Sequence, residues 1–541
     1  MATTSDPATD GIKVNRKFLL DTQQNMAQDY TGQCFPGAED ATERFCDFIA
    51  RTEFEDIPDQ ALTKLFDLVI DHIGVGAGGG AHSESSEHII KGVEAFAMGS
   101  VGKSTVYGKG RTYPIQIAAL LNGAFAHSFD YDDTLAIGII HTGASVIPAA
   151  LAQAEASEAT GTLLLTALSV GYEVASRLGR ALSNGGYPRG FHNTSTAGIF
   201  GAVAAISKIK GLTSEQIYNA FGLAGSKTAG SMQFLDNGSW NKRLHPGFAA
   251  HDAFLCVALA EAGVTGAAHI IEGKWGFLQA HSANVNAVGL TESLGMKWLY
   301  PATAMKPFPA CRFTHTAIEV TAKLAAKSNS QKLPDRIVVG LTRAGYGIVG
   351  EPNPNKKHPQ TIVDAQFSIY YQVAVAWLFG SDIGWGAYDA DKMESKQVAQ
   401  LCDRIEVKIN DKLEKEFEVR MVFSGIGGVG DIEEAMVYPL GEDEHPFSHE
   451  RVEKKFRSLT ASIYDSDRAG RILQAVQGLP NGQSKDLIEL LPAERVALRL
   501  ARCCQGSMDT GKRAERAPAA NGHKSLAESE IQDVIVCEEK K

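Results

Sequence analysis

The sequence contains no CxxC pair, although it has eight cysteines among 541 residues. Zinc ribbons and thioredoxin-like redox sites require closely spaced cysteine pairs, so neither is expected. The scattered cysteines also form no disulfide framework, which predicts a protein of a reducing compartment. We expect a cytoplasmic location, with a mitochondrial location left open as the alternative.

Long apolar runs and targeting segments are also missing. Each apolar stretch is interrupted by glycine, histidine or a charged residue before it reaches the length of a membrane span. The first ten residues contain acidic side chains and lack the apolar core of a secretory signal. Basic residues are outnumbered, and the formal net charge of −11 disfavours nucleic acid and anionic membranes as partners.

Nucleotide-binding loops are absent despite two partial matches. Residues 74–79 spell GxGxxG, but the amphipathic helical pattern of Leu62–Ile73 precedes them where a dinucleotide site needs a strand. We therefore predict that these glycines end a helix. Gly102-Lys103-Ser104 resembles the end of a phosphate-binding loop, but Ala97 stands where the first glycine is required.

Helical periodicity dominates the first 300 residues. From Glu43 onward, apolar residues recur every three or four positions. The pattern predicts helices at 115–127, 144–160, 161–182, 195–209, 214–231 and 247–263. The segment 336–341 is predicted to be a strand, and apolar–polar alternation predicts further strands at 404–409 and 417–423. A helix is predicted between them at 364–379. Helical periodicity returns at 450–456 and 469–476.

These patterns predict a mainly α protein in which a smaller α+β domain is inserted into a large all-helical domain. We place the helical domain at 41–300 and 447–502 and the α+β domain at 301–446. A polar arm at 1–40 is predicted to be flexible. The tail at 503–541 has no pattern of a buried face, which predicts disorder.

One short segment concentrates charge among apolar neighbours. Residues 127–134 read His-Ser-Phe-Asp-Tyr-Asp-Asp-Thr, and His141 follows after a short apolar stretch. Carboxylates this close repel one another and raise some of their pKa values, which suits acid–base chemistry. Taken alone, the segment also fits a solvated turn or a helix cap.

Three further clusters supply imidazoles and cations. They are His192 at the start of a helix, Lys242 with Arg243 and His245 before another helix, and Lys306 followed by Cys311, Arg312 and His315. Each cluster alone also fits a cap or a solvated surface. Together they provide cations for carboxylates and imidazoles that titrate near neutrality. Without a metal cluster or nucleotide motif beside them, the implied chemistry is cofactor-free and acts on a polycarboxylate.

In this order, the clusters resemble the MmgE/PrpD family, which includes 2-methylcitrate dehydratases and cis-aconitate decarboxylases. The resemblance runs from about residue 41 to residue 500 and includes blocks at 118–127, 242–250, 306–311 and 364–369. It implies a large helical domain and a smaller α+β lid with the active site between them. It also implies a homodimer that uses no cofactor and binds a small polycarboxylate, not nucleic acid or membrane.

The resemblance further implies roles for individual residues. Those that align with active-site residues of cis-aconitate decarboxylases are Asp130, Thr134, His141, His192, Lys242 and Lys306. We predict catalytic roles for His141, His192, Asp130, Thr134 and Lys242. We predict substrate-binding roles for Lys306, Cys311, Arg312 and His245, and no metal ligands.

Two departures from the family pattern bear on the substrate. The loop between Asp130 and His141 is slightly longer than in the animal decarboxylases and lacks their histidine shortly after the threonine. Cys311 stands where those enzymes have a histidine. The identity of the acid is therefore left open by the resemblance.

The resemblance implies a lyase acting on a tricarboxylate. A decarboxylase protonates the alkene of a cis-aconitate-like acid while the adjacent carboxylate leaves as CO₂. A dehydratase removes an α-proton from 2-methylcitrate or a longer alkylcitrate while the hydroxyl departs. Both reactions need the same side chains, so the sequence does not separate them. A dicarboxylate epimerase or isomerase and a non-catalytic paralogue are the remaining alternatives.

Overall fold

The computed structural model describes residues 35–328, 333–426 and 430–493. The predicted tail at 503–541 and most of the predicted arm at 1–40 lie outside the described residues. The protein is mainly α, as predicted, with two small sheets in the described part. Within the described residues, every helix is too short or too polar to span a lipid bilayer.

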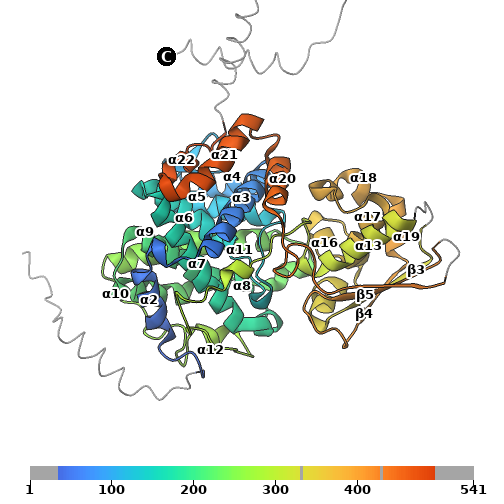
Figure 1. Cartoon of the computed structure of the whole chain (residues 1–541), viewed down its shortest axis with the longest axis horizontal. Helices are drawn as coiled ribbons and strands as arrows, with labels where there is room; N and C mark the ends of the chain where they lie inside the picture. The colour runs from blue at the N-terminus through green and yellow to red at the C-terminus, as the bar shows by residue number, and fades with distance from the viewer. Residues whose placement is uncertain (1–34, 329–332, 427–429, 494–541) are drawn as a thin grey trace, which may run out of the picture. The chain divides into compact units, whose positions relative to one another are not determined.

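The larger group of helices is centred on α5 (Ile115–Ser128). It packs against α3 (Asp59–His82), α11 (Asn241–Glu261) and α6 (Gly143–Ser157), as Figure 1 shows. Further packing comes from α7 (Gly161–Leu182) and α9 (Gly198–Lys210). The sequences of α5, α6 and α9 are mostly apolar on every face, which explains why these helices are buried on almost all sides.

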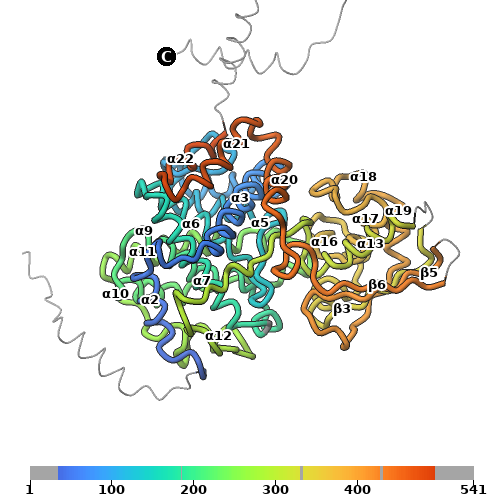
Figure 2. Tube along the Cα trace, viewed as in Figure 1, coloured from blue at the N-terminus to red at the C-terminus, as the bar shows by residue number. Residues whose placement is uncertain are grey.

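Shorter elements complete this group. They are α2 (Ala41–Arg51), α4 (Ser86–Phe96), α8 (Asn193–Thr196), α10 (Ser214–Ala224), α12 (Phe277–His281) and the two-stranded ribbon of β1 (Ser104–Thr105) and β2 (Thr112–Tyr113). The helix predicted at 214–231 therefore ends early, and short 3₁₀ turns follow it. The chain returns to this group through α20 (His449–Thr460), α21 (Ser466–Gly478) and α22 (Ser484–Ile488). Figure 2 shows α20 beside α3.

The glycine run of α3 corrects the prediction that these residues end a helix. The helix continues through residues 74–80 as far as His82. A Cβ on Gly79 would lie 2.1 Å from the carbonyl oxygen of Phe125 in α5. On the other side of α5, a Cβ on Gly247 of α11 would lie 2.4 Å from the carbonyl oxygen of Leu120. The glycines are therefore needed for close approach of helix backbones, although each costs about 1 kcal/mol of helix propensity.

The second group is built on a four-stranded sheet. Its spatial order is β4 (Ile405–Ile409), β3 (Arg336–Leu341), β5 (Val419–Ser424) and β6 (Ile432–Met436). β3 and β4 are parallel, with Ile337 opposite Ile405, and the other pairs are antiparallel. The three predicted strands are confirmed. β6 was not predicted because its sequence, Ile-Glu-Glu-Ala-Met, lacks apolar alternation, as befits an edge strand.

Helices share a second hydrophobic core with this sheet. The main ones are α13 (His315–Ser328), α17 (Ile369–Phe379) and α19 (Lys396–Cys402), with the short α14 (Arg343–Gly345), α15 (Pro354–Lys357), α16 (Ile362–Gln366) and α18 (Ala390–Met393). The helix predicted at 364–379 is divided because Ser368 caps α17 by accepting a hydrogen bond from the backbone of Tyr371. The domain boundaries stay predictions.

Candidate active site

One small cavity collects all but one of the residues predicted to form the site. Its walls come from the loop after α5, the start of α11 and the segment before α13, and its volume is about 40 Å³. The predicted residues that line it are Asp130, Thr134, His141, His192, Lys242, Lys306, Cys311 and Arg312. His245 does not line the cavity, because it lies behind His192.

Asp130 holds two lysines in the cavity wall. Its Oδ1 accepts hydrogen bonds from Lys242 Nζ at 2.7 Å and from Lys306 Nζ at 2.8 Å. Lys306 also donates to the backbone carbonyl of Asp130 at 2.9 Å, and its side chain is fully buried. Asp130 has φ 49°, a left-handed conformation that aspartate tolerates better than most residues. The cluster thus combines segments that are far apart in the sequence.

The charges of this cluster leave one positive charge in excess. Burial raises the pKa of Asp130, but Lys242 and Lys306 outweigh burial and hold this pKa well below its ordinary value. Asp130 is therefore ionised near neutral pH. Each ammonium group has three N–H donors. Lys306 uses two of these donors in hydrogen bonds to Asp130, and Lys242 uses one. Three of the six donors are therefore free to bind another anion.

His141 is held in one tautomer. Its Nδ1 lies 2.8 Å from the backbone carbonyl oxygen of Asp133 and 3.4 Å from Thr134 Oγ1. A carbonyl oxygen only accepts hydrogen bonds, so Nδ1 carries the proton and Nε2 keeps its lone pair. The backbone N–H of His141 donates to Thr194 Oγ1 at 3.1 Å, which ties this residue to α8.

The environment of His141 favours the neutral imidazole. Burial lowers its pKa, and Lys306 and Lys242 lower it further, while the carboxylate of Asp132 acts in the opposite direction. A neutral ring with a free Nε2 is a base. The same ring becomes an acid if nearby anions offset the lysine charges and raise its pKa.

His192 and His245 form a buried imidazole pair. Their Nδ1 atoms are 3.0 Å apart, so one ring donates and the other accepts. Burial lowers the pKa of His192 well below its ordinary value, and His245 and Lys242 add to the effect. Burial also lowers the pKa of His245, to about 4. His245 therefore fixes the orientation of His192 from outside the cavity.

Two buried residues of the charged segment were not predicted as site residues. Asp132 Oδ2 lies 2.6 Å from Nδ1 of His127, and both side chains are almost fully buried. Their sequence signal was present, because both belong to the segment 127–134. Sequence spacing did not reveal the pair, since His127 lies in the last turn of α5 and Asp132 lies in the loop beyond it.

Asp133 links the segment to α6. Its two carboxyl oxygens each accept from the backbone N–H of Gly143 at 3.1 Å, and Oδ2 accepts from Tyr172 Oη at 2.9 Å. A Cβ on Gly143 would lie 2.3 Å from Tyr172 Oη, so no other residue fits there without displacement. Burial raises the pKa of Asp133 to about 7, with Asp132 adding to the effect.

Arg312 and Cys311 occupy the cavity wall in different chemical states. The guanidinium of Arg312 is engaged by Glu442, with Nη2 2.6 Å and Nε 2.8 Å from Oε1, and by the carbonyl oxygen of Leu440. Burial raises the pKa of Cys311 to about 11, and Asp130 adds to the effect, so this side chain is a neutral thiol. The charge of Arg312 is therefore offset by a carboxylate of its own, whereas Lys242 and Lys306 share the single carboxylate of Asp130.

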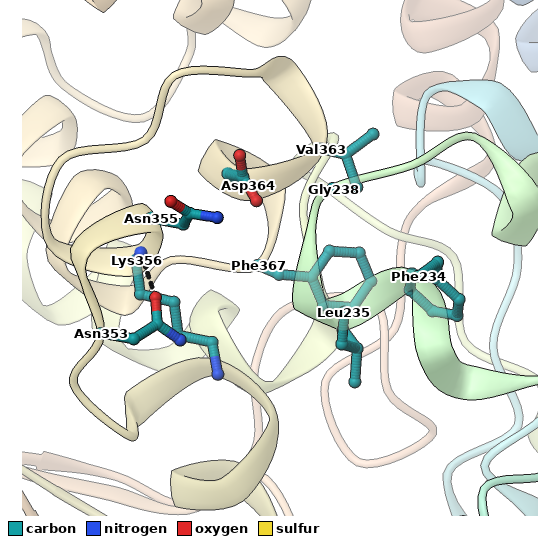
Figure 3. A pocket seen from close by; sticks show the side chains of 9 residues that line it. All are labelled: Phe234, Leu235, Gly238, Asn353, Asn355, Lys356, Val363, Asp364 and Phe367. Carbon is teal, nitrogen blue, oxygen red and sulfur yellow. Dashed lines mark hydrogen bonds between the residues drawn. The ribbon is translucent and has the colours of Figure 1, made fainter.

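Tyr187 and six apolar side chains form the rest of the cavity wall. The Oη of Tyr187 donates to the carbonyl oxygen of Ile139 at 3.2 Å. The apolar side chains are Ile139, Met232, Phe313, Ile348, Phe367 and Phe417. Two of them, Ile139 and Phe417, also line a neighbouring vestibule of about 450 Å³. Behind Phe367 lies a separate pocket of about 10 Å³, which Figure 3 shows between Phe234 and Asp364. That pocket is too small for more than a water molecule.

Two groups of side chains bring their possible ligand atoms within 4.8 Å of one another. They are His127, His141 and His192, and Asp130, Asp132 and His141. Nδ1 of His127 is bound to Asp132, Nδ1 of His141 to a backbone carbonyl and Nδ1 of His192 to His245. The absence of metal ligands stays a prediction from the sequence.

The buried imidazoles predict loss of stability in acid. Burial lowers the pKa of His72 and His127 to about 3 and that of His245 to about 4, below the unfolded value of about 6.5. Such groups stabilise the fold above pH 6.5 and lose this contribution as the pH falls toward the folded pKa. Asp133 acts in the opposite sense, because its raised pKa makes its contribution largest in acid.

We expect the free energy of unfolding to fall between pH 7 and pH 5, because over this range the unfolded chain binds protons at these imidazoles, and at those of His141 and His192, that the folded protein does not bind. Urea titrations at several pH values measure this slope. The variant His127→Gln should have a shallower slope, and the exposed-site control His358→Gln should match the wild type. Equal slopes for all three proteins would contradict the explanation.

Comparison with known proteins identifies the family of the chain. The family models described as the MmgE/PrpD N-terminal domain and the MmgE/PrpD C-terminal domain match residues 43–288 and 308–481. The chain belongs to the MmgE/PrpD family.

Among the relatives is a cis-aconitate decarboxylase-like protein of Aspergillus oryzae. It is 27% identical over 474 residues, which cover 83% of this chain and 96% of that protein. The cis-aconitate decarboxylase of Homo sapiens is 27% identical over 455 residues, 81% of this chain and 91% of that enzyme. A cis-aconitate decarboxylase of Aspergillus terreus is 25% identical over 478 residues, 83% of this chain and 95% of that enzyme.

Proposed function

We propose that the chain is a cofactor-independent lyase that decarboxylates a tricarboxylate of the cis-aconitate type. The observation that carries the proposal is the pair of buried lysines fixed by Asp130 beside a neutral imidazole with a free Nε2. The family and the names of the relatives support an enzyme of this kind. The homodimer and the cytoplasmic location stay predictions.

Lys242 and Lys306 are proposed to bind substrate carboxylates. The three free N–H donors and the excess positive charge suit an anion, and charge-assisted hydrogen bonds in a buried site are stronger than in water. Thr134, which also lines the cavity, adds a hydroxyl that donates or accepts. Asp130 keeps the two ammonium groups in place before the acid arrives.

His141 is proposed to deliver the proton. Bound carboxylates offset the charges of Lys242 and Lys306, which raises the pKa of His141 and lets Nε2 take up a proton. The C–C bond to the departing carboxylate then breaks, and its electrons form a new alkene. The former alkene electrons bind the proton from His141 Nε2, and CO₂ leaves. Solvent returns the proton to the imidazole.

The cavity must widen to admit this substrate. A volume of about 40 Å³ holds only a few water molecules, and a tricarboxylate is several times larger. The wall contains Phe313, Ile348 and Phe417 from the second group of elements, whose cluster of core residues is separate from that of the helices. Displacement of this side is proposed to open the site.

A second candidate is the dehydratase of 2-methylcitrate or of a longer alkylcitrate. The apolar half of the cavity and its contact with the vestibule at Ile139 and Phe417 favour it, because an unsubstituted tricarboxylate has no apolar part to match them. In this reaction the neutral His141 would remove the α-proton directly. The departing hydroxyl would need a second acid, for which His192 is the lining candidate.

One assay separates the candidates. The purified full chain is incubated with cis-aconitate, citrate and 2-methylcitrate. We expect CO₂ release from cis-aconitate, whereas a gain of ultraviolet absorbance from a citrate would identify a dehydratase. Solvent deuterium uptake without either signal would indicate an isomerase. No turnover, exchange or binding with any of these acids would contradict the proposed function.

A further inference from the structure

Asp132 contacts two imidazoles with one carboxylate. Its Oδ2 lies 2.6 Å from His127 Nδ1, and its Oδ1 lies 3.4 Å from His141 Nδ1. Asp132 is 1% exposed and does not line the cavity, so it reaches a substrate only through another side chain. The carboxylate is therefore directly behind the ring proposed to move the proton.

His127 lies among the imidazoles without lining the cavity. Its ring meets that of His141 edge-on, with centroids 4.7 Å apart, and stacks on that of His192 at 5.6 Å. Its Nε2 is buried and has no hydrogen-bond partner in the part of the chain that the structure describes. Among the described residues, the His127 side chain is therefore held by its hydrogen bond to Asp132.

Charged and titratable groups face His141 from several elements. They are Asp130, Asp132 and Asp133 of its own loop, His127 of α5, His192 before α8, Lys242 of α11 and Lys306. The two lysines disfavour an imidazolium. Asp132 is the ionised carboxylate nearest to Nδ1, and its pKa is far below the ordinary value because His127 and His141 outweigh the effect of burial. An anion in this place stabilises an imidazolium and restrains the ring.

We propose that Asp132 is a positioning residue for His141 and that His127 holds Asp132 in place through its Nδ1–H. The proposal rests on the proposed function only in that the site moves a proton through His141. When His141 Nε2 gains a proton, the positive charge spreads over a ring whose Nδ1 side faces the Asp132 carboxylate. His127 takes no part in substrate binding.

The first test is Asp132→Asn, which keeps the shape and removes the charge. We expect kcat to fall about 10- to 100-fold, as for other residues that orient a functional group from behind, with KM within twofold of the wild type. The limb of the pH profile that reports His141 should move to lower pH, because the imidazolium has lost its nearby anion. A fall in activity without a shift of that limb would overturn the proposal.

A second pair of variants separates positioning from folding. His127→Asn places an amide N–H near the position of Nδ1 and should keep kcat within about threefold, because it still holds Asp132. His127→Leu has no donor and should repeat the loss and the pH shift of Asp132→Asn. Equal activity of the Leu and Asn variants would overturn the role given to His127.

A third measurement does not require turnover. Hydrogen–deuterium exchange at the imidazole C2 position, followed by mass spectrometry over a pH series, gives the pKa of each histidine. Asp132→Asn should lower the pKa of His141 and leave that of exposed His358 unchanged. An unchanged pKa of His141 would overturn the proposal, whether or not the protein turns over a tricarboxylate. Failure of every tricarboxylate as a substrate would contradict the proposed function but not the proposal about Asp132.

Discussion

His141→Ala is expected to lower kcat about 10³-fold, within the range of 10²–10⁴ that general acid–base groups contribute. The variant loses the only atom, Nε2, to which the proposed mechanism gives the proton, and no other group takes over its position. The protein should stay folded, although loss of the hydrogen bond from Nδ1 to the Asp133 carbonyl lowers the free energy of unfolding by about 1–3 kcal/mol. Steady-state kinetics and circular dichroism of the same preparation measure both quantities.

The matched control for this variant is His358→Ala. His358 is exposed and pairs with Asp403 on the surface, so its removal should leave kcat and KM unchanged. Lys242→Ala should also abolish turnover, because it removes a cation of the cavity that has two free donors. Rates near those of the wild type in both His141→Ala and Lys242→Ala would contradict the assignment of this cavity as the active site.

Asp130→Asn is expected to lower the free energy of unfolding by about 3–5 kcal/mol, the usual cost of breaking a buried ion pair from one side. The two ammonium groups of Lys242 and Lys306 would stay buried without a counter-charge. Asparagine adopts the left-handed conformation at φ 49° as readily as aspartate, so the backbone contributes nothing to the loss. Urea unfolding at pH 7 measures the change.

Asp40→Asn is the control for this loss. Asp40 also has a left-handed backbone, with φ 52°, but its side chain is exposed and precedes α2. Its substitution should cost less than about 1 kcal/mol. The double variant Asp130→Asn with Lys306→Met should be less destabilised than the sum of the single changes, because one buried charge is removed with its partner. Additive losses would contradict the coupling.

Local sequence patterns predicted the elements that local chemistry determines. The helix at 161–182 and the strand at 336–341 have the predicted bounds. Thr160 caps the helix, and the strand is a short run rich in β-branched residues. The glycines of α3 were misinterpreted because they allow close contacts with neighbouring elements. Gly79 contacts α5 and Gly74 contacts α20, and a contact between helices leaves no periodic signal in either sequence.

The candidate site was predictable by residue type but not by arrangement. Lys242 and Lys306 were recognised as cations for a polycarboxylate, yet the sequence does not indicate that both bind the same oxygen of Asp130. Arg312 was grouped with them, although Glu442 engages its guanidinium from 130 positions further along the chain. Such pairings depend on how distant segments pack, and one sequence alone carries no information about them.

The two walls of the site differ in how well they should tolerate amino-acid substitution, because glycine contacts fix α5 on both sides. At Gly79 and Gly247, main-chain atoms of α3 and α11 meet the main chain of α5, and no rotamer can adjust such a contact. His127 lies in the last turn of α5 and Asp130 follows this helix, so these contacts fix the positions of both residues. The opposite wall, with Phe313 and Phe417, is built from side chains that can be exchanged one at a time. Substitutions at Phe313 and Phe417 can therefore change which acid fits the cavity, while the backbone around His127 and Asp130 stays in place.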